Sequence, residues 1–170
     1  MKIIRTKTTY LQMRSAPQQS TGPPRSDVRV RLLDEPTVAE YRALYQGVGG
    51  HLHWFNRLLI SESELVSILH HPANEVYVLE VANERQGFFE LDLRDGQNIE
   101  VAYFGLFPAV IGQGLGKYLL GAALDVAWSK KPGRVWLHTC DLDHPAALPN
   151  YLRAGFQVYD ERMVDQQVPT

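Results

Sequence analysis

The feature that most constrains the fold is a glycine-rich segment between a strand pattern and a helix pattern. The segment reads Ile-Gly-Gln-Gly-Leu-Gly-Lys over residues 111–117. Before it, residues 98–107 are nearly uncharged, which predicts a strand buried on both faces. After it, Leu115–Ser129 predicts a long helix with one apolar face. Glycines expose backbone N–H groups, and a helix N-terminus adds partial positive charge. The arrangement therefore predicts a phosphate or pyrophosphate site in an α/β fold.

The glycine spacing argues against two common nucleotide-binding motifs. A P-loop needs Gly-x-x-x-x-Gly-Lys-Ser/Thr, but Ile111 occupies the first glycine position and Tyr118 the Ser/Thr position. A dinucleotide fingerprint needs Gly-x-Gly-x-x-Gly after the first strand, whereas this chain has Gly-x-Gly-x-Gly after several predicted strands. A P-loop nucleotide hydrolase is therefore disfavoured. A glycine-rich turn without a ligand stays open as an alternative.

The remaining pattern predicts antiparallel hairpins followed by alternating strands and helices. Strands are predicted at residues 8–14, 28–32, 75–81, 86–93, 98–107, 134–140 and 156–159. Helices are predicted at residues 37–45, 61–70, 115–129 and 145–154, and Ser61 with Glu64 forms a capping box at the second. This order predicts a mixed, mostly antiparallel central sheet with helices on both faces. Residues 1–26 read as an N-terminal strand and Pro/Ser-rich extension, and residues 27–170 as a single domain.

Charge and cysteine content narrow the classes of partner. The net charge of −2 argues against nucleic acid. The first 26 residues hold five basic residues and no acid, which leaves 12 basic and 19 acidic residues, a net charge of −7, for residues 27–170. One cysteine, Cys140, excludes a disulfide within the chain and a Cys-rich zinc site. No apolar run is long enough to span a bilayer, so we expect no membrane partner and a cytoplasmic location.

The glycine segment and its surroundings resemble the first motif of the GCN5-related N-acetyltransferases, the GNAT family. The family pattern is Arg/Gln-x-x-Gly-x-Gly/Ala, and it follows a strand that ends near a proline. Here Pro108 follows the strand, and Gly114 and Gly116 fill the last two motif positions. Ile111 departs from the usual Arg or Gln, which removes one side-chain contact but leaves the backbone cradle.

A second motif downstream resembles the same family. The family pattern is Asn-x-x-Ala-x-x-x-Tyr-x-x-x-Gly-Phe, and this chain matches it in register at Ala147, Tyr151, Gly155 and Phe156. His144 stands where asparagine is usual. The two motifs cover about residues 98–157. Together they imply a GNAT-like acyl-CoA N-acyltransferase fold.

The resemblance implies acetyl-CoA as co-substrate and transfer of its acetyl group to a primary amine by direct attack. It implies that the strand backbone binds the pantetheine arm at a splayed sheet edge, as a further strand would. The implied cofactor-binding residues are Phe104, Gly105, Leu106, Ile111, Gly112, Gln113, Gly114, Leu115, Gly116, Lys117 and His144. His144 could equally cap a helix.

Two residues are the predicted catalytic groups. Glu100 lies on the strand before the glycine segment, at the offset of the base in family members that use a glutamate. Strand alternation places it on one face with Ala102 and Phe104, where burial would raise its pKa toward neutrality. The alternative is a paired carboxylate at a strand end, and Glu90 is the reserve base. Tyr151 matches the family tyrosine that protonates the leaving sulfur, although core packing is its alternative.

The acceptor is not identified by the sequence. A small-molecule amine, an amino acid, an antibiotic and a peptide or protein lysine all stay open. Trp54, Arg57 and Glu90 are the predicted substrate-binding residues: Trp54 could stack on a substrate and Arg57 could pair with a carboxylate, although a packed surface loop is an alternative. A homodimer is one expected state, because dimers are common in similar proteins.

The sequence also allows other interpretations of its cysteine, its histidines and its CoA-binding motifs. The Cys140 thiol as a nucleophile and a metal site at His51, His53, His70 and His71 are both disfavoured, so no metal is expected. The main alternative to an enzyme is a CoA-binding module that senses or regulates without turnover. The departures at Ile111 and His144 favour that alternative.

Overall fold

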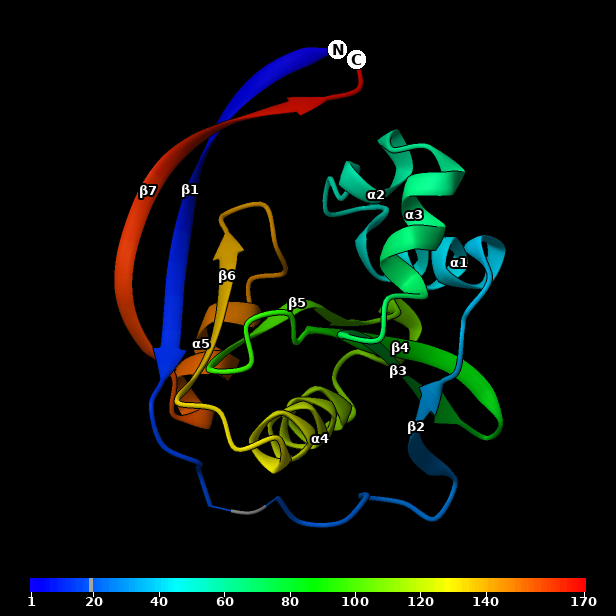
Figure 1. The fold of residues 1–170 in the computed structure, drawn as a ribbon, viewed down its shortest axis with the longest axis vertical. Helices are drawn as coiled ribbons and strands as arrows, with labels where there is room; N and C mark the ends of the chain where they lie inside the picture. Colours follow the sequence, from blue (N-terminus) through cyan, green and yellow to red (C-terminus); the bar gives the residue numbers. More distant parts are fainter. Residues whose placement is uncertain (19) are drawn as a thin grey trace.

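The computed structural model describes residues 1–18 and 20–170, which form a mixed sheet with helices on both faces (Figure 1). The sheet order in this part of the chain is β2-β3-β4-β5-β6-β1-β7. All neighbouring strands are antiparallel except β5 and β6, which are parallel. The strands are β1 Lys2–Met13, β2 Val28–Leu33, β3 Asn74–Val81, β4 Glu84–Asp92, β5 Asn98–Leu106, β6 Arg134–Cys140 and β7 Gln157–Val168. The predicted fold class is confirmed.

Two hydrophobic clusters bind the helices to opposite faces of the sheet. Helices α1 (Val38–Gly49), α2 (Asn56–Leu59) and α3 (Glu62–Leu69) cover one face, with α1 packed on β4 and β5 and α3 on β3. Helix α4 (Leu115–Ser129) covers the other face across β4 and β5, and α5 (Ala147–Ala154) packs beside it. Ser61 caps α3 as the sequence predicts, because its side chain accepts the Glu64 N–H at 3.2 Å.

The glycines of α1 pack inside the helix instead of ending it. The sequence predicts a helix end at Tyr45, but α1 continues to Gly49. A Cβ atom at Gly47 would lie 2.4 Å from the Phe107 ring, and one at Gly49 would lie 2.1 Å from the Trp54 ring. These positions need glycine because two aromatic rings pack directly on the helix backbone. The same close packing holds Trp54 and Phe107 against the cluster under α1.

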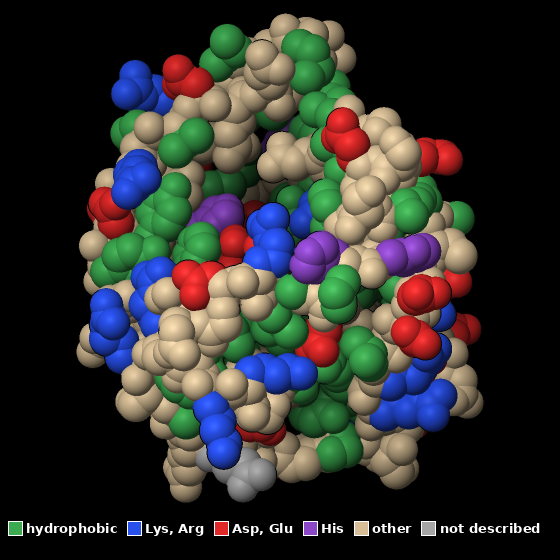
Figure 2. Space-filling model, viewed as in Figure 1, with side chains coloured by type: hydrophobic (Ala, Val, Ile, Leu, Met, Phe, Trp, Pro, Cys, Tyr) green, Lys and Arg blue, Asp and Glu red, His purple; other side chains and the backbone are tan. Residues whose placement is uncertain are grey.

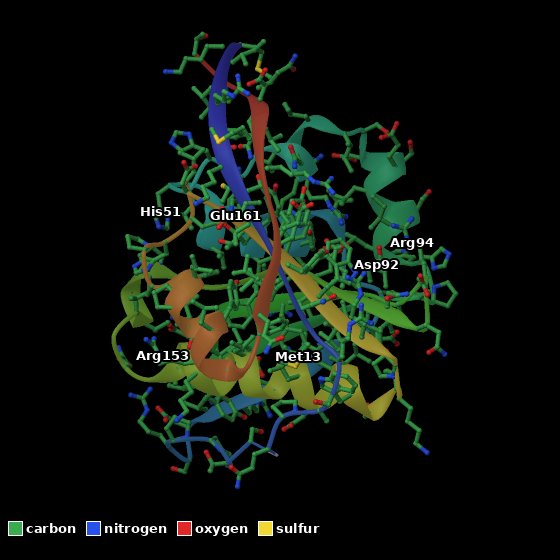
Figure 3. The ribbon with its side chains drawn as sticks, turned by 90° about the vertical axis from the view of Figure 1, so that its left-hand side faces the viewer. Met13, His51, Asp92, Arg94, Arg153 and Glu161 are labelled. Atoms are coloured by element: carbon green, nitrogen blue, oxygen red, sulfur yellow. The ribbon has the colours of Figure 1, made fainter. Side chains whose placement is uncertain are left out.

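The first and last strands form a long antiparallel ribbon. β1 pairs with β6 on one side and β7 on the other, and the two chain ends lie close together (Figure 1). The ribbon leaves the body and curves toward α2 and α3, and in the turned view β7 runs across the front of the molecule (Figure 3). The predicted strands at residues 8–14 and 156–159 are therefore too short. Most of β7 is exposed, so its sequence lacks the alternating apolar residues of a half-buried strand.

A bulge in β5 decides which side chains share a face. Glu90 pairs with Tyr103, but Leu91 pairs with Val101, so Ala102 is an extra residue on β5. Beyond the bulge the alternation shifts by one residue. Phe104 packs in the cluster under α4, whereas Tyr103 packs in the cluster under α1. The predicted shared face of Glu100 and Phe104 is therefore wrong, because strict alternation fails at a bulge.

The helices of the described residues are short and amphipathic. None of them combines the length and the apolar character that a helix needs to cross a membrane.

The connection from β5 to α4 runs through a 3-10 turn at Pro108–Val110 and then through the glycine segment.

Candidate active site

The parallel strands β5 and β6 separate and open a cleft through the middle of the sheet. They pair only where Asn98–Glu100 lies beside Arg134–Trp136, so the rest of β5 has a free edge toward β6 in the described structure. A cavity of about 1140 Å³ fills this gap and reaches from the glycine segment to α2, α3 and the ribbon. Figure 2 shows the surface hollowed between the ribbon and α3. Because the gap runs through the sheet, side chains from both faces line one cavity.

The glycine segment is held open by left-handed backbone conformations. Gly112 has φ +88° and Gly114 has φ +77°, values that a residue with a Cβ adopts only with strain. Gly114 caps α4 with no side-chain hydrogen bond, so the first turn of this 15-residue helix keeps its N–H groups free of a side-chain cap. Gly112, Gly114, Gly116, Ile111 and Lys117 line the cavity. The geometry suits an anion bound by backbone donors.

Two members of the predicted cofactor set turn away from the cavity. The Leu115 side chain is 1% exposed and lies in the core under the sheet. The Gln113 side chain accepts a hydrogen bond from Arg25 at 3.1 Å, which ties the N-terminal extension to the glycine segment. Their side chains therefore do not line the cavity. Any contact of these two residues with a cofactor would therefore come from their backbone N–H groups, and their predicted cofactor role stays a prediction.

The free edge of β5 and the start of α5 complete the cofactor side. Phe104, Gly105 and Leu106 line the cavity, as predicted for the strand edge. A Cβ atom at Gly105 would lie 2.2 Å from Val48, so only glycine lets α1 approach this edge. His144 also lines the cavity, and its Nδ1 atom accepts the Ala146 N–H at 3.0 Å. The histidine thus supports the turn before α5 and faces the cavity at the same time.

Glu100 lies on the cavity wall with the properties of a base. Its side chain is 20% exposed, and Nδ1 of His138 lies 3.8 Å from its Oε1 atom. Burial, together with repulsion from Asp92 and Glu90, raises the pKa of Glu100 to about 7. The raised pKa predicted from the sequence is confirmed, although the neighbours differ from those expected. The carboxylate makes no hydrogen bond within the described residues, so it can accept a proton from a ligand.

Tyr151 reaches the same cavity from the opposite face of the sheet. Its ring packs edge-on against Phe104 and Phe156, each with centroids 6.0 Å apart, and the residue is 7% exposed. Burial and the charge of Asp143 raise the pKa of the phenol above its usual value. Tyr151 is therefore a core residue and a cavity-lining residue together, and its hydroxyl stays protonated. A protonated phenol in this place can donate to a group in the cavity.

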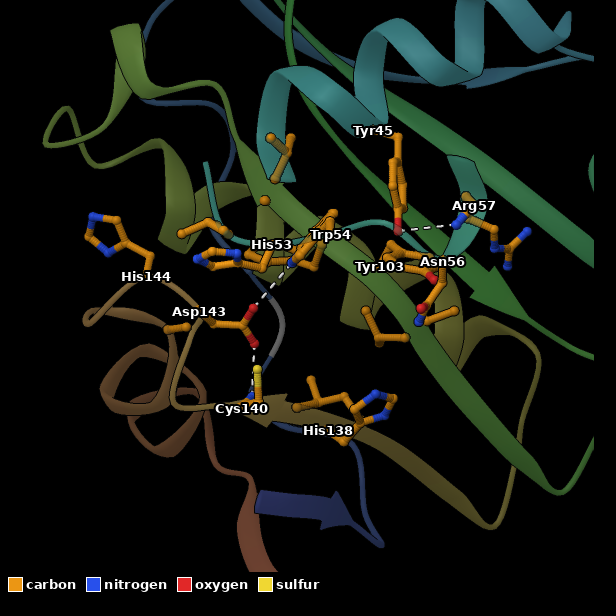
Figure 4. A pocket seen from close by; sticks show the side chains of 18 of the residues that line it. Tyr45, His53, Trp54, Asn56, Arg57, Tyr103, His138, Cys140, Asp143 and His144 are labelled. Atoms are coloured by element: carbon orange, nitrogen blue, oxygen red, sulfur yellow. Dashed lines mark hydrogen bonds between the residues drawn. The ribbon is translucent and has the colours of Figure 1, made fainter. Parts of the chain in front are cut away.

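An aromatic cluster forms the far side of the cavity. Tyr45, Trp54 and Tyr103 have ring centroids 5.2–5.4 Å apart. Trp54 Nε1 donates to Asp143 at 3.2 Å, which connects the segment after α1 to the segment after β6 across the cleft (Figure 4). Asp143 also accepts from the Thr139 hydroxyl at 2.6 Å and the Cys140 N–H at 3.0 Å. Trp54 is therefore fixed in the cavity wall, as its predicted binding role requires.

Arg57 and Glu90 form a buried ion pair that engages both oxygens of Glu90 but leaves Arg57 Nη1 without a hydrogen-bond partner among the described residues. Arg57 Nη2 lies 2.9 Å from Glu90 Oε2, and the Tyr41 hydroxyl donates to the other carboxylate oxygen at 2.6 Å. Glu90 is 0% exposed and does not line the cavity. The reserve role of Glu90 as a base or substrate ligand is therefore corrected. Arg57 does line the cavity; Glu90 balances its charge through Nη2, while Nη1 keeps a donor without a partner among the described residues.

Several cavity residues were not among the predicted site residues, and three of them carry ionisable side chains that bear on the proposed chemistry: His138, Asp143 and Arg153. His138 lies on β6, Asp143 lies in the segment after β6, and Arg153 lies on α5; all three line the cavity. The alternation Trp136, His138, Cys140 along β6 was a signal for His138, because alternate strand residues share a face. Arg153 had no such signal, since a basic residue near the end of a helix usually lies in solvent.

The described residues add nothing in favour of a metal site or of Cys140 as a nucleophile. No group of three or more His, Cys, Asp or Glu side chains in residues 1–18 and 20–170 could hold a metal ion. Burial raises the pKa of the Cys140 thiol, so the thiol is a weaker nucleophile than an ordinary cysteine.

The family is decided by a sequence model of the acetyltransferase (GNAT) family, which matches residues 36–156. This chain belongs to the GNAT family. The resemblance seen in the two motifs is thus confirmed, and membership supports acyl transfer as the class of reaction. No curated protein matches this GNAT chain.

Solved structures show the same fold at low sequence identity. A functionally unknown conserved protein from Staphylococcus epidermidis matches with a TM-score of 0.70 and 15% identity, over 98% of this chain and 64% of its own. A GNAT acetyltransferase from Elizabethkingia anophelis with acetyl-CoA bound matches with a TM-score of 0.61 and 19% identity, over 80% of each chain. An aminoglycoside acetyltransferase from an uncultured soil metagenomic sample, in complex with sisomicin, matches with a TM-score of 0.62 and 16% identity, over 76% of this chain and 88% of its own.

The GNAT chain is shorter than some of its structural neighbours. It spans 64% of the Staphylococcus epidermidis protein and 53% of a Drosophila protein that matches with a TM-score of 0.70 and 12% identity over 99% of this chain.

Proposed function

We propose that this chain transfers the acetyl group of acetyl-CoA to a primary amine by direct attack. The observation that carries the proposal is one cavity that joins the glycine segment, the free edge of β5, Glu100 and Tyr151. Family membership supports acyl transfer, and a structural neighbour with acetyl-CoA bound supports the choice of donor.

Backbone groups supply most of the proposed cofactor binding. The N–H groups at the start of α4 would hold the pyrophosphate of acetyl-CoA, and the free edge of β5 would pair with the pantetheine amides. Lys117 and Arg153 both line the cavity and would add positive charge for the phosphates. If backbone N–H groups supply most of the phosphate contacts, residues 27–170 can bind a cofactor with several phosphates despite their net negative charge.

Glu100 is the proposed base. Its pKa of about 7 lets Glu100 exchange a proton near neutral pH. An ionised Glu100 can take a proton from the ammonium group of the acceptor, directly or through water, and the neutral amine can then attack the thioester carbonyl. Burial lowers the pKa of His138, so the neighbouring imidazole is mostly neutral and does not lock Glu100 in an ion pair.

Tyr151 is the proposed acid. As the C–S bond of the thioester breaks, the sulfur gains negative charge, and the phenol donates its proton or a hydrogen bond to it. The raised pKa of Tyr151 keeps the proton on the phenol until this step.

Replacing Tyr151 by Phe removes this donor while keeping the ring that packs on Phe104. We expect the transfer rate to fall by roughly 10²-fold, the lower end for loss of a general acid. Acetyl-CoA should still raise the melting temperature, since the variant keeps the glycine segment. Tyr118→Phe, on α4 and outside the cavity lining, is the matched control and should transfer at the wild-type rate. Equal rates for Tyr151→Phe and the control would remove Tyr151 from the mechanism.

A further inference from the structure

Arg134 is a cation held by neutral groups. Its Nε donates to the Asn98 side-chain oxygen at 2.8 Å, and its Nη1 donates to the Gln12 side-chain oxygen at 3.1 Å. The guanidinium carbon lies 5.6 Å from the Trp136 ring centre and 5.5 Å from the Tyr159 ring centre. Within the described residues Arg134 has no acidic partner, and Nη2 has no hydrogen bond. The guanidinium is fixed in place with its charge uncompensated.

The strand register places this cation beside the proposed base. In the parallel pair, Asn98 lies opposite Arg134 and Glu100 lies opposite Trp136. Arg134 is therefore two residues, or about 7 Å along the strand, from the level of Glu100. A second pocket of about 530 Å³ is lined by both Arg134 and Glu100, and it shares Glu100, Asp92 and Arg94 with the main cavity. A ligand can thus lie with one end at Glu100 and the other at Arg134.

Apart from Arg134, the charged residues of this second pocket are three acidic residues and Arg94, which is paired with one of them. Arg94 donates to both carboxylate oxygens of Asp92, at 2.7 Å and 3.0 Å, and the two residues lie together at the end of β4 (Figure 3). Asp95 accepts from the Gln97 N–H and from the Asn98 side chain, each at 3.1 Å. The pocket therefore offers acidic oxygens and one free guanidinium. That combination complements a ligand with both an ammonium group and a carboxylate.

We propose that the acceptor is an amine that also carries a carboxylate, and that Arg134 binds this carboxylate while the amine lies at Glu100. The assignment rests on the proposed acetyl transfer and narrows its substrate class. Arg57, the residue that the sequence suggested for this role, is neutralised by Glu90. A phosphate is a poorer fit, because a dianion would meet the carboxylates of Asp92 and Asp95 with only one free cation to hold it.

The test compares amino acids with their carboxamides, which are nearly isosteric but lack the negative charge. The probes are glycine, β-alanine, γ-aminobutyrate and ε-aminocaproate, each against its carboxamide. We expect the wild type to favour at least one carboxylate by tenfold or more in kcat/KM. Arg134→Gln should remove most of this preference, because it should raise KM for the carboxylate much more than KM for the matching carboxamide. Arg29→Gln, an exposed arginine on β2 paired with Glu80, is the control and should keep the preference.

A binding measurement separates this inference from the proposed function. Calorimetric titration of the same probes into the CoA-loaded protein needs no turnover. If no amine is acetylated, the proposed function fails, but tighter binding of a carboxylate by the wild type than by Arg134→Gln would still support the anion site. Equal binding of each carboxylate and its carboxamide by the wild type would overturn the role of Arg134, as would an unchanged preference in Arg134→Gln.

Discussion

Replacing Glu100 by Gln should lower kcat/KM by roughly 10²- to 10⁴-fold, the usual contribution of a general base. Glutamine keeps the size of the side chain but cannot take a proton. In the wild type, Glu100 is active when ionised, so the rate should rise with pH through about 7 and then level off. The variant should lose this acidic limb, because the group that titrates there is absent. The measurement is a pH profile of kcat/KM for both proteins with one acceptor.

The control for this profile is Glu161→Gln, which changes an exposed glutamate on β7 that pairs with Lys7. It should keep both the rate and the acidic limb. If Glu100→Gln also kept the limb, the base would be another cavity group, and His138, 3.8 Å from Glu100, would be the first residue to test.

Replacing Arg57 by Ala should destabilise the fold by about 3–5 kcal/mol, the cost of leaving one partner of a buried ion pair behind. Glu90 is 0% exposed, and Arg57 is the largest of the influences that oppose the rise in the pKa of Glu90 on burial. Without the arginine, the carboxylate must stay charged in an apolar site or take up a proton. Urea unfolding followed by fluorescence gives the change in the free energy of unfolding.

Two further variants show whether the effect comes from the buried charge. The double variant Arg57→Met with Glu90→Gln removes both charges and leaves Tyr41 an amide oxygen as acceptor, so at least half of the lost stability should return. Arg85→Ala breaks a partly exposed pair with Glu40 and should cost less than about 1 kcal/mol. If Arg57→Ala kept full stability and lost only the binding of carboxylate substrates, Arg57 would be a substrate ligand as the sequence suggested.

Local signals in the sequence located the elements that build the cofactor side. The helix at Leu115–Ser129 and the strand at Arg134–Cys140 have the predicted bounds, because apolar periodicity and the flanking glycines and prolines act over a few residues. The resemblance of two motifs to the GNAT family implied that the glycine segment and Tyr151 lie at the cofactor site, and Gly112, Gly114, Gly116 and Tyr151 all line the cavity. The bounds of these two elements depend on neighbours a few residues away, which a sequence pattern can record, whereas the contact of Tyr151 with Phe104 joins residues far apart in the chain.

The contacts that decide the acceptor side join residues far apart in the chain. Arg57 meets Glu90 across 33 positions, Trp54 meets Asp143 across 89, and Arg134 meets Gln12 across 122. A sequence pattern does not show such pairs, so it predicts neither the ion pair of Arg57 with Glu90 nor the position of Arg134 in a pocket with Glu100. The bulge at Ala102 likewise depends on pairing with β4.

Several expectations stay predictions. They are the domain boundary at residue 26, a homodimer, a cytoplasmic location and the absence of nucleic-acid, membrane and metal partners.

The central claim is that the chain cleaves acetyl-CoA only by passing its acetyl group to an amine. The most direct measurement is the release of free CoA thiol in the presence of a mixed library of primary amines, with mass spectrometry of the products. We expect CoA release that depends on an amine and an equal amount of N-acetylated product. Binding of acetyl-CoA without any thioester cleavage across the library would contradict the claim and would favour a CoA-binding module without turnover.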